Sequence, residues 1–202
     1  MPDVPALLLA AGTARRMGRP KQLLPWGGVT LIEHQLATLR RAGLEVTVIL
    51  GAYAERIDPI LAPHDVPSYP FSDWQRGMGA SIAFGMEQLM QSEKEIAGVL
   101  VCLVDQPLVK AAHFTALLDR FRPGTKQIIA SRDTEGNTGP PVLFDAHYFP
   151  ELLKLDGELG AKPVVKRHRE RVEWVDCATS LADVDTPEAY ARLKNFQSAN
   201  GQ

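Results

Sequence analysis

Small and basic residues concentrate in one short segment of this 202-residue chain. Residues 9–21 have the sequence LAAGTARRMGRPK, in which the basic residues are Arg15, Arg16, Arg19 and Lys21. Small residues let the backbone approach a ligand, and glycines permit the φ values that turn several N–H groups toward one anion. The segment therefore suits a triphosphate, although it has neither the Walker spacing nor GxGxxG. The alternative interpretation is a basic surface loop with two turn glycines.

Carboxylates at two further points offer ligands for a divalent cation. Asp105 ends an apolar run, and Pro107 stops any strand hydrogen bonding directly after it. Asp183 and Asp185 alternate along an extended segment, which places both on one face. Because Mg²⁺ takes one or two carboxylates and completes its shell with phosphate oxygens and water, these residues predict a magnesium site. Ordinary turn or helix-capping aspartates are the alternative.

A third segment, residues 77–81 with the sequence GMGAS, precedes an expected helix. Its glycines allow a base or a ribose to approach the backbone, but a simple helix-entry turn explains them equally well. The five histidines show neither ligand spacing nor a Ser-His-Asp order. Trp26, Trp74 and Trp174 are expected to be packing residues or pocket walls.

Strands and helices alternate along the chain and must position these segments. Apolar runs predict strands at 4–10, 44–50, 96–104, 127–131, 140–144 and 172–176. Helices are expected at 30–42, 55–61, 110–121, 146–153 and 161–169. A further helix should begin within 76–81 and end near residue 90. The last helix should begin at Pro187, with Thr186 as its N-cap. The pattern predicts an α/β fold with a Rossmann-like open, mostly parallel sheet and helices on both faces. Ligands of such sheets lie beyond the carboxyl ends of the strands, where the basic segment and Asp105 are both expected.

The composition, with 45% hydrophobic and 23% charged residues, is that of an ordinary globular protein. A formal net charge of −2 argues against an extended nucleic-acid surface, which needs excess positive charge. No apolar run approaches the roughly 20 residues of a membrane span, and the first residues lack the pattern of a signal peptide. Cys102 lies in an apolar run and is expected to be a buried thiol, and a cytoplasmic location is predicted.

Taken together, these segments resemble the molybdopterin nucleotidyltransferase family, and most closely its molybdenum cofactor cytidylyltransferase branch. The matching segments occur in the family's order over about residues 6–193. They are Leu8–Gly12, Arg16–Gly18, Lys21 with Leu23–Pro25, Gly77–Ser81, Asp105–Pro107, Gly139–Phe144, Gly157–Lys162 and Asp183–Pro187.

The resemblance implies a nucleotide-diphospho-sugar transferase type of fold that binds CTP and Mg²⁺. It implies a single domain, 1–202, with a nucleotide-binding half at 1–135 and an acceptor-binding half at 136–195. By analogy the nucleotide-binding residues are Ala10, Ala11, Gly12, Arg16, Lys21, Gly79, Ser81 and Asp105. The implied catalytic residues are Lys21, Arg16 and Asp105, and the implied metal ligands are Asp105 and Asp185.

Two details of the resemblance bear on substrate choice. The guanylyltransferase branch carries a different motif where this chain has residues 77–81, which favours CTP over GTP. The family often has Asp and Arg where this chain has Glu158 and Lys162. A lysine holds a phosphate as a point charge but does not reproduce the bidentate fork of arginine, so acceptor binding at these two positions stays open.

The implied reaction is attack by the terminal phosphate of molybdopterin on the α-phosphorus of CTP, with pyrophosphate leaving. Because two anions must meet, charge neutralisation and positioning carry most of the catalysis. No general base is needed, since the acceptor phosphate is already ionised near neutral pH.

Three other interpretations stay open. A sugar phosphate is the main rival acceptor, because sugar-phosphate nucleotidyltransferases share a similar glycine-rich loop and lysine. A cofactor-binding chaperone would instead deliver molybdopterin cytosine dinucleotide to a partner molybdoenzyme. A dinucleotide-dependent oxidoreductase is suggested only by the fold.

Overall fold

A computed structural model describes residues 3–13, 17–92 and 94–200, with only the backbone for 198–200. Its main sheet has seven strands in the order β5-β4-β1-β6-β8-β7-β9. Every neighbouring pair is parallel except the two that β8 makes, with β6 and β7. The bounds are β1 Ala6–Ala10, β4 Val46–Leu50, β5 Ser68–Pro70, β6 Gly98–Leu103, β7 Ile128–Asp133, β8 Thr138–Asp145 and β9 Val172–Cys177.

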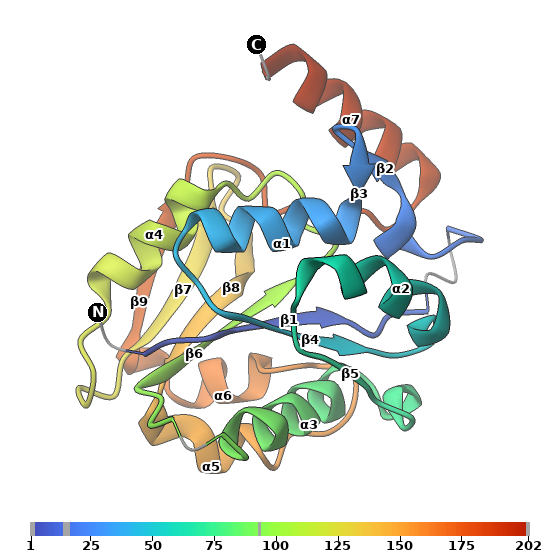
Figure 1. Cartoon of the computed structure of the whole chain (residues 1–202). Helices are drawn as coiled ribbons and strands as arrows, with labels where there is room; N and C mark the ends of the chain where they lie inside the picture. The colour runs from blue at the N-terminus through green and yellow to red at the C-terminus, as the bar shows by residue number, and fades with distance from the viewer. Residues whose placement is uncertain (1–2, 14–16, 93, 201–202) are drawn as a thin grey trace.

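Helices cover both faces of this sheet (Figure 1). One face carries α1 (Leu31–Arg41), α2 (Ala54–Leu61) and α4 (Ala111–Arg120). The other carries α3 (Met78–Met90), α5 (Phe149–Leu152) and α6 (Lys162–Arg167). Short 3-10 helices are η1 Lys21–Leu23, η2 Ala62–His64, η3 Trp74–Arg76, η4 Ala146–Tyr148 and η5 Arg169–Arg171. The predicted open, mostly parallel sheet with helices on both faces is confirmed.

Strand β1 lies in the middle of the parallel part of the sheet and is buried along its whole length. Successive side chains of a strand point to opposite faces. Leu8 accordingly packs in the cluster with α1, α2 and α4, whereas Leu7 and Leu9 pack in the cluster with α3 and α5. This explains why the sequence of β1 is continuously apolar rather than alternating. Cys102 on the neighbouring β6 is buried, as predicted.

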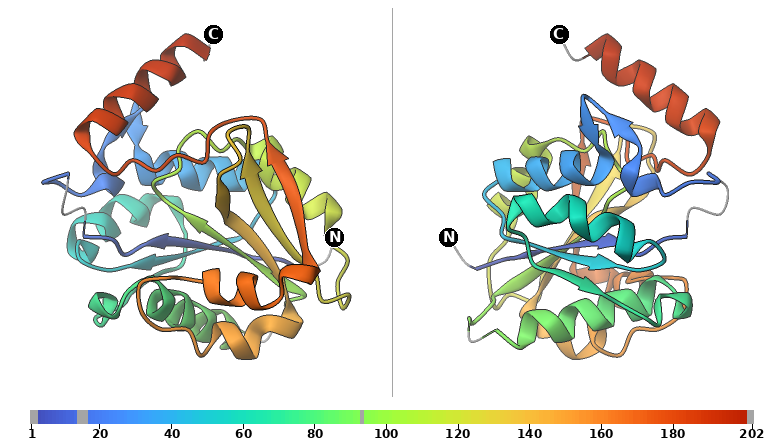
Figure 2. Two further views of the ribbon diagram at one scale, coloured as in Figure 1. Left: turned by 180° about the vertical axis from the view of Figure 1, so that it is seen from behind. Right: turned by 45° about the vertical axis from the view of Figure 1, so that its right-hand side comes forward.

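A small third cluster joins the last helix, α7 (Pro187–Asn200), to a hairpin of β2 (Pro25–Trp26) and β3 (Val29–Thr30). From this attachment α7 extends away from the rest of the molecule (Figure 2). Thr186 Oγ1 accepts a hydrogen bond of 3.2 Å from the N–H of Ala189, which confirms Thr186 as the N-cap. The hairpin and the short edge strand β5 were not predicted, since runs of two and three residues show no periodicity.

The tryptophans occupy the expected kinds of position. Trp26 is a fully buried packing residue, whereas Trp74 and Trp174 form parts of two different cavity walls.

No helix in the described part of the chain is both long enough and apolar enough to cross a membrane.

Helix α4 is joined to strands β7 and β8 through a buried polar contact. Ser131 donates to the carbonyl of Pro141 over 2.7 Å, so its oxygen is the acceptor for His113 Nε2, 2.8 Å away. Nε2 of His113 therefore carries a proton. Burial lowers the pKa of His113 to about 4.

This depressed pKa predicts a loss of stability in mild acid. The unfolded chain takes up a proton at His113 near pH 6.5, so the free energy of unfolding should fall as the pH drops from about 6.5 to 4, by an amount on the order of 3 kcal/mol. In the variant His113→Gln, whose amide also donates to Ser131, that part of the pH dependence should be missing. Denaturant unfolding at pH 7.5, 5.5 and 4.5 measures it. Equal pH dependence of the two proteins would show that His113 is not the titrating group.

Candidate active site

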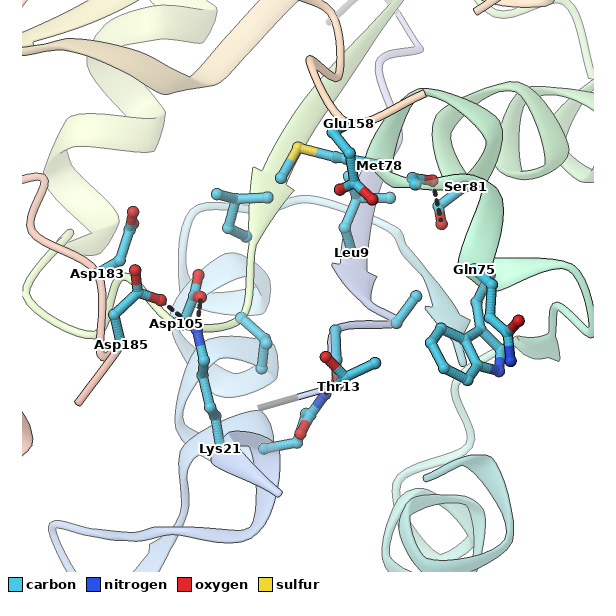
Figure 3. Close-up of a pocket in the computed structure, with 17 residues that line it drawn as sticks. Leu9, Thr13, Lys21, Gln75, Met78, Ser81, Asp105, Glu158, Asp183 and Asp185 are labelled. Carbon is cyan, nitrogen blue, oxygen red and sulfur yellow. Dashed lines mark hydrogen bonds and ion pairs between the residues drawn. The ribbon is translucent and has the colours of Figure 1, made fainter. Parts of the chain in front are cut away.

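A cavity of about 560 Å³ opens at the carboxyl ends of β1 and β6. Figure 3 shows Lys21, Asp105, Asp183 and Asp185 grouped at one end of it, with Ser81 and Gln75 on the opposite wall. The predicted positions of Gly12, Lys21 and Asp105 at this edge of the sheet therefore agree with the structure. The cavity lies where open α/β sheets bind their ligands.

Lys21 joins two carboxylates from distant parts of the chain. Its Nζ donates to Asp105 Oδ2 over 2.9 Å and to Asp185 Oδ1 over 2.5 Å. Burial alone would lower the pKa of Lys21, but the attraction of Asp105 and hydrogen bonds to both carboxylates outweigh it, and the pKa lies above its ordinary value. The ammonium is therefore charged, and one carboxylate oxygen of Asp105 and one of Asp185 both point toward it.

Asp183 adds a third carboxylate to this end of the cavity, next to the pair that Lys21 joins. Partial desolvation, together with the negative charges of Asp105 and Asp185, raises the pKa of Asp183 to about 7, even though the residue is exposed in the open cavity. The site thus holds more negative charge than Lys21 alone neutralises. An additional cation would be favoured here.

Two buried glutamines bring these groups together. Gln22 Nε2 donates to the carbonyls of Ala10, over 2.7 Å, and Gly12, over 3.3 Å, which fastens the segment carrying Lys21 to the end of β1. Gln106 Nε2 donates to the carbonyl of Leu181 over 3.0 Å. A backbone hydrogen bond of 2.8 Å from Val184 to Asp105 completes the second attachment. The segment before α7 is thereby held beside the end of β6, with Asp183 and Asp185 facing the cavity.

The loop after β1 lies tightly against the end of β4. A Cβ at Gly51 would be only 2.5 Å from the carbonyl oxygen of Ala11, so only glycine allows this approach. Tyr53 donates from its hydroxyl to the carbonyl of Thr13 over 2.7 Å. These contacts fix the backbone that forms the floor of the cavity next to Lys21.

The glycines of the 77–81 segment serve packing between chain segments. Gly77 has a φ of +104°, and a Cβ there would be 2.5 Å from the carbonyl carbon of Gly157. A Cβ at Gly79 would lie 2.5 Å from the carbonyl oxygen of Asp156. The start of α3 therefore packs directly on the 156–158 loop, and this places Glu158 in the cavity wall. The hydroxyl of Ser81 donates to the carbonyl of Gly77 over 3.2 Å.

The sequence-predicted residues separate into three groups. Six line the cavity: Ala11, Gly12, Lys21, Ser81, Asp105 and Asp185. Ala10 and Gly79 lie behind the wall, where Ala10 accepts the Gln22 hydrogen bond and Gly79 packs against Asp156. Arg16 lies outside the described residues. The sequence did not indicate the wall residues Gln22 and Gln75, and no local pattern identifies them, since long-range packing places them there.

The geometry fits a divalent cation between the two aspartates. Among the residues that the structure describes, no three His, Cys, Asp or Glu side chains are grouped closely enough to hold a metal by themselves. Mg²⁺ needs only one or two carboxylates when phosphates supply other ligands. Asp105 and Asp185 already converge on a cation, the Lys21 ammonium, which occupies the place where a metal ion would fit.

A second cavity of about 870 Å³ adjoins the first, and the two share the wall residues Met78, Leu103 and Asp183. Glu158 lines the first cavity, whereas Lys162 lines the second. The acidic end of the first cavity thus lies at the boundary between two spaces. This arrangement is suited to a reaction that joins two ligands.

The chain matches the sequence profile of the MobA-like NTP transferase domain over residues 6–172. The nicotine blue oxidoreductase of Paenarthrobacter nicotinovorans is 33% identical over 205 residues, covering 96% of this chain and 97% of that protein. The molybdenum cofactor guanylyltransferase of Xanthomonas euvesicatoria is 28% identical and covers 93% of this chain and 92% of its own length.

Solved structures show the same architecture. Rv0371c from Mycobacterium tuberculosis H37Rv is 30% identical, with a TM-score of 0.81 and coverage of 96% of this chain and 98% of that one. A structure of Rv0371c in complex with manganese has a TM-score of 0.77 at 29% identity, with the same coverage of both chains.

The position of Lys21 predicts competition between its ammonium and a metal ion. Replacing it in Lys21→Met removes the positive charge that neutralises Asp105 and Asp185, so Mn²⁺ should bind the nucleotide-free variant more tightly. We expect a gain of about tenfold, or about 1.4 kcal/mol. Electron paramagnetic resonance titration of free Mn²⁺ measures this. The exposed Lys110→Met is the matched control, and an equal or weaker Mn²⁺ affinity in Lys21→Met would contradict the arrangement.

Proposed function

The chain belongs to the MobA-like NTP transferase family and is a nucleotidyltransferase, and we propose that it transfers CMP from CTP to the terminal phosphate of molybdopterin. The Lys21–Asp105–Asp185 group supports this proposal, because it lines the first cavity beside Asp183, which also lines the second. A nucleotide in the first cavity and an acceptor in the second would meet beside this group. The product would be the cytosine dinucleotide form of the cofactor.

The residues of the first cavity suit the binding of a triphosphate. The backbone of the loop after β1, with Ala11 and Gly12, faces the cavity without large side chains in the way. Lys21 supplies a charged ammonium on a flexible stem, which can move from the aspartates to the phosphates. Lys21, and Arg16 in the same segment, would then stabilise the departing pyrophosphate. No histidine is required, because the attacking phosphate is already ionised.

Asp105 and Asp185 would hold Mg²⁺, which when bound would neutralise charge on the reacting phosphates. The displaced Lys21 would keep the net charge of the site low when two anionic substrates are present. Ser81 and Gln75 lie on the wall opposite the carboxylates, which leaves that side for the nucleoside. We assign 1–135 to nucleotide binding and 136–195 mainly to acceptor binding, although Glu158 and Asp185 of the second part also reach the first cavity.

Support for CTP comes from the 77–81 segment, which resembles that of the cytidylyltransferase branch. Pyrophosphate release should be measured with each of the four NTPs and Mg²⁺, with and without molybdopterin. We expect release with CTP only in the presence of molybdopterin. Release with GTP would overturn the base assignment, and release with glucose 1-phosphate in place of molybdopterin would support the sugar-phosphate alternative. No release with any NTP would favour a delivery protein for a molybdoenzyme.

A redox function is a second candidate, because the nicotine blue oxidoreductase is 33% identical over nearly the whole chain. That function predicts consumption of NADH or NADPH with an aromatic acceptor and no need for an NTP. Absorbance at the nicotinamide band, followed with and without CTP, separates the two reactions.

Asp105→Asn should abolish most of the turnover while the protein stays folded. The amide keeps the size of the side chain but removes the charge that would hold the cation, and losing one such group costs at least about 100-fold in rate. Steady-state pyrophosphate release measures the loss, and circular dichroism checks the fold. Asp119→Asn, an exposed position on α4, is the matched control. Turnover within a few-fold of the wild-type rate would remove Asp105 from the catalytic group.

A further inference from the structure

A tight turn joins β7 to β8, and the side chain of Asp133, the last residue of β7, organises it. Asp133 Oδ1 accepts hydrogen bonds from the N–H of Glu135 over 3.0 Å and from the N–H of Asn137 over 2.9 Å. Asp133 Oδ2 accepts from Asn137 Nδ2 over 3.0 Å. These three bonds are typical of an aspartate in a turn. They leave a fourth bond unexplained, in which the N–H of Leu181 donates to the same Oδ2 over 3.4 Å.

Leu181 belongs to the segment 178–186, which runs from β9 to α7 across the end of the sheet (Figure 2). In the parallel pairing of β7 with β9, Asp133 lies opposite the last residue of β9, so this segment leaves β9 directly beside Asp133. Asp183 and Asp185 follow on the same segment, and both line the first cavity. The fourth bond therefore joins the β7–β8 turn to the segment that carries two of the three carboxylates of the site.

The backbone of Leu181 is held from two sides. Asp133 accepts from its N–H, and the buried Gln106 donates to its carbonyl oxygen over 3.0 Å. Gln106 directly follows Asp105, and the N–H of Val184 donates to the carbonyl of Asp105 over 2.8 Å. The segment is thus anchored at residues 181 and 184. Its two carboxylates lie between these anchored positions and directly after them.

This anchoring opposes electrostatic repulsion. Asp105, Asp183 and Asp185 bring three carboxylates to one end of the first cavity, where Lys21 supplies one positive charge. Like charges at short distance repel, so the carboxylates tend to push the 178–186 segment away from the end of β6. Fixed hydrogen bonds to the backbone of that segment resist the displacement.

The bond to Leu181 also explains why this position carries an aspartate. Asp133 is only 5% exposed, and no cation in the described part of the chain forms an ion pair with it. Burial alone would raise the pKa of Asp133, but the hydrogen bonds from Asn137, Leu181 and Glu135 outweigh it, and the pKa lies below its ordinary value. An asparagine has one acceptor oxygen, which would serve the two backbone N–H groups of the turn. Only a carboxylate offers the second acceptor that the N–H of Leu181 uses.

We infer that Asp133 is a positioning residue for the metal site, which sets the place of Asp185 relative to Asp105 by holding the backbone of Leu181. Asp133 is not among the residues that line either cavity, so it acts only through the 178–186 segment. This inference rests on the proposed function, because that function makes Asp105 and Asp185 the metal ligands. It adds a residue that touches neither the metal nor a substrate.

Asp133→Asn tests the inference, because the amide oxygen can keep the turn while the NH₂ group faces the N–H of Leu181. Hydrogen–deuterium exchange of the 178–186 segment should become faster. Mn²⁺ should bind the nucleotide-free variant about tenfold more weakly in an electron paramagnetic resonance titration. At saturating Mg²⁺, kcat of pyrophosphate release should fall while the KM for CTP stays within about twofold. If this variant does not fold, Asp133→Ser replaces it, since a serine hydroxyl also accepts in such turns but is shorter.

The matched control is Asp145→Asn. Asp145 is also buried at the end of a strand and also accepts from two backbone N–H groups, those of Gly124 and His147, but these bonds do not reach the 178–186 segment. The control should destabilise the fold while leaving Mn²⁺ affinity and the exchange of the 178–186 segment unchanged.

Equal Mn²⁺ affinity in Asp133→Asn and Asp145→Asn would overturn the inference. Unchanged exchange of the 178–186 segment in Asp133→Asn would overturn it as well. A wild-type protein that binds Mn²⁺ but releases no pyrophosphate would contradict the proposed function alone, because the Mn²⁺ and exchange measurements decide the role of Asp133 without turnover.

Discussion

The Lys21 ammonium holds together two carboxylates that lie 84 and 164 residues further along the chain. Without a cation between them, Asp105 and Asp185 would repel each other at the edge of the sheet, with Asp183 adding to the repulsion. The remainder of the site depends on this attraction. The hydrogen bonds of Gln22 and Gln106 bring the segments that carry Lys21, Asp105 and Asp185 near one another. The ammonium of Lys21 then neutralises the negative charge of the two aspartates. The same cation is the one that a metal ion and a triphosphate would displace.

Close backbone approach is the second constraint, and glycine satisfies it at the two sides of the first cavity. Gly51 allows the loop after β1 to lie against the end of β4, and Gly79 allows α3 to begin directly on the 156–158 loop. Both approaches are too close for a Cβ, so the cavity walls are fixed by the backbone. A site that must align two anions benefits from such rigidity, because misplacement of the reacting atoms is costly.

Much of this arrangement is predictable from the sequence. Lys21 and Asp105 follow two apolar strands, and the topology of a parallel sheet brings their ends to one edge, as observed. The alternation of Asp183 and Asp185 indicated an acidic segment, but nothing local places Asp185 beside Asp105, because the Gln106 and Val184 hydrogen bonds that do so span distant segments. From the sequence, Gly79 was expected to let a base or a ribose approach the backbone. In the structure it instead lets the backbone of Asp156 approach the start of α3. The paired glycines at 27–28, both with positive φ, form a recognisable hairpin turn whose flanking strands are too short to show a period.

In the proposed function, Lys21 occupies the place of a metal ion and moves when a nucleotide binds. A crystal structure with Mn²⁺ and a non-hydrolysable CTP analogue tests it directly, because the anomalous signal of manganese locates the ion. We expect manganese between Asp105 and Asp185, with Lys21 turned onto the phosphates. Manganese bound elsewhere, with Lys21 still between the two aspartates, would contradict it.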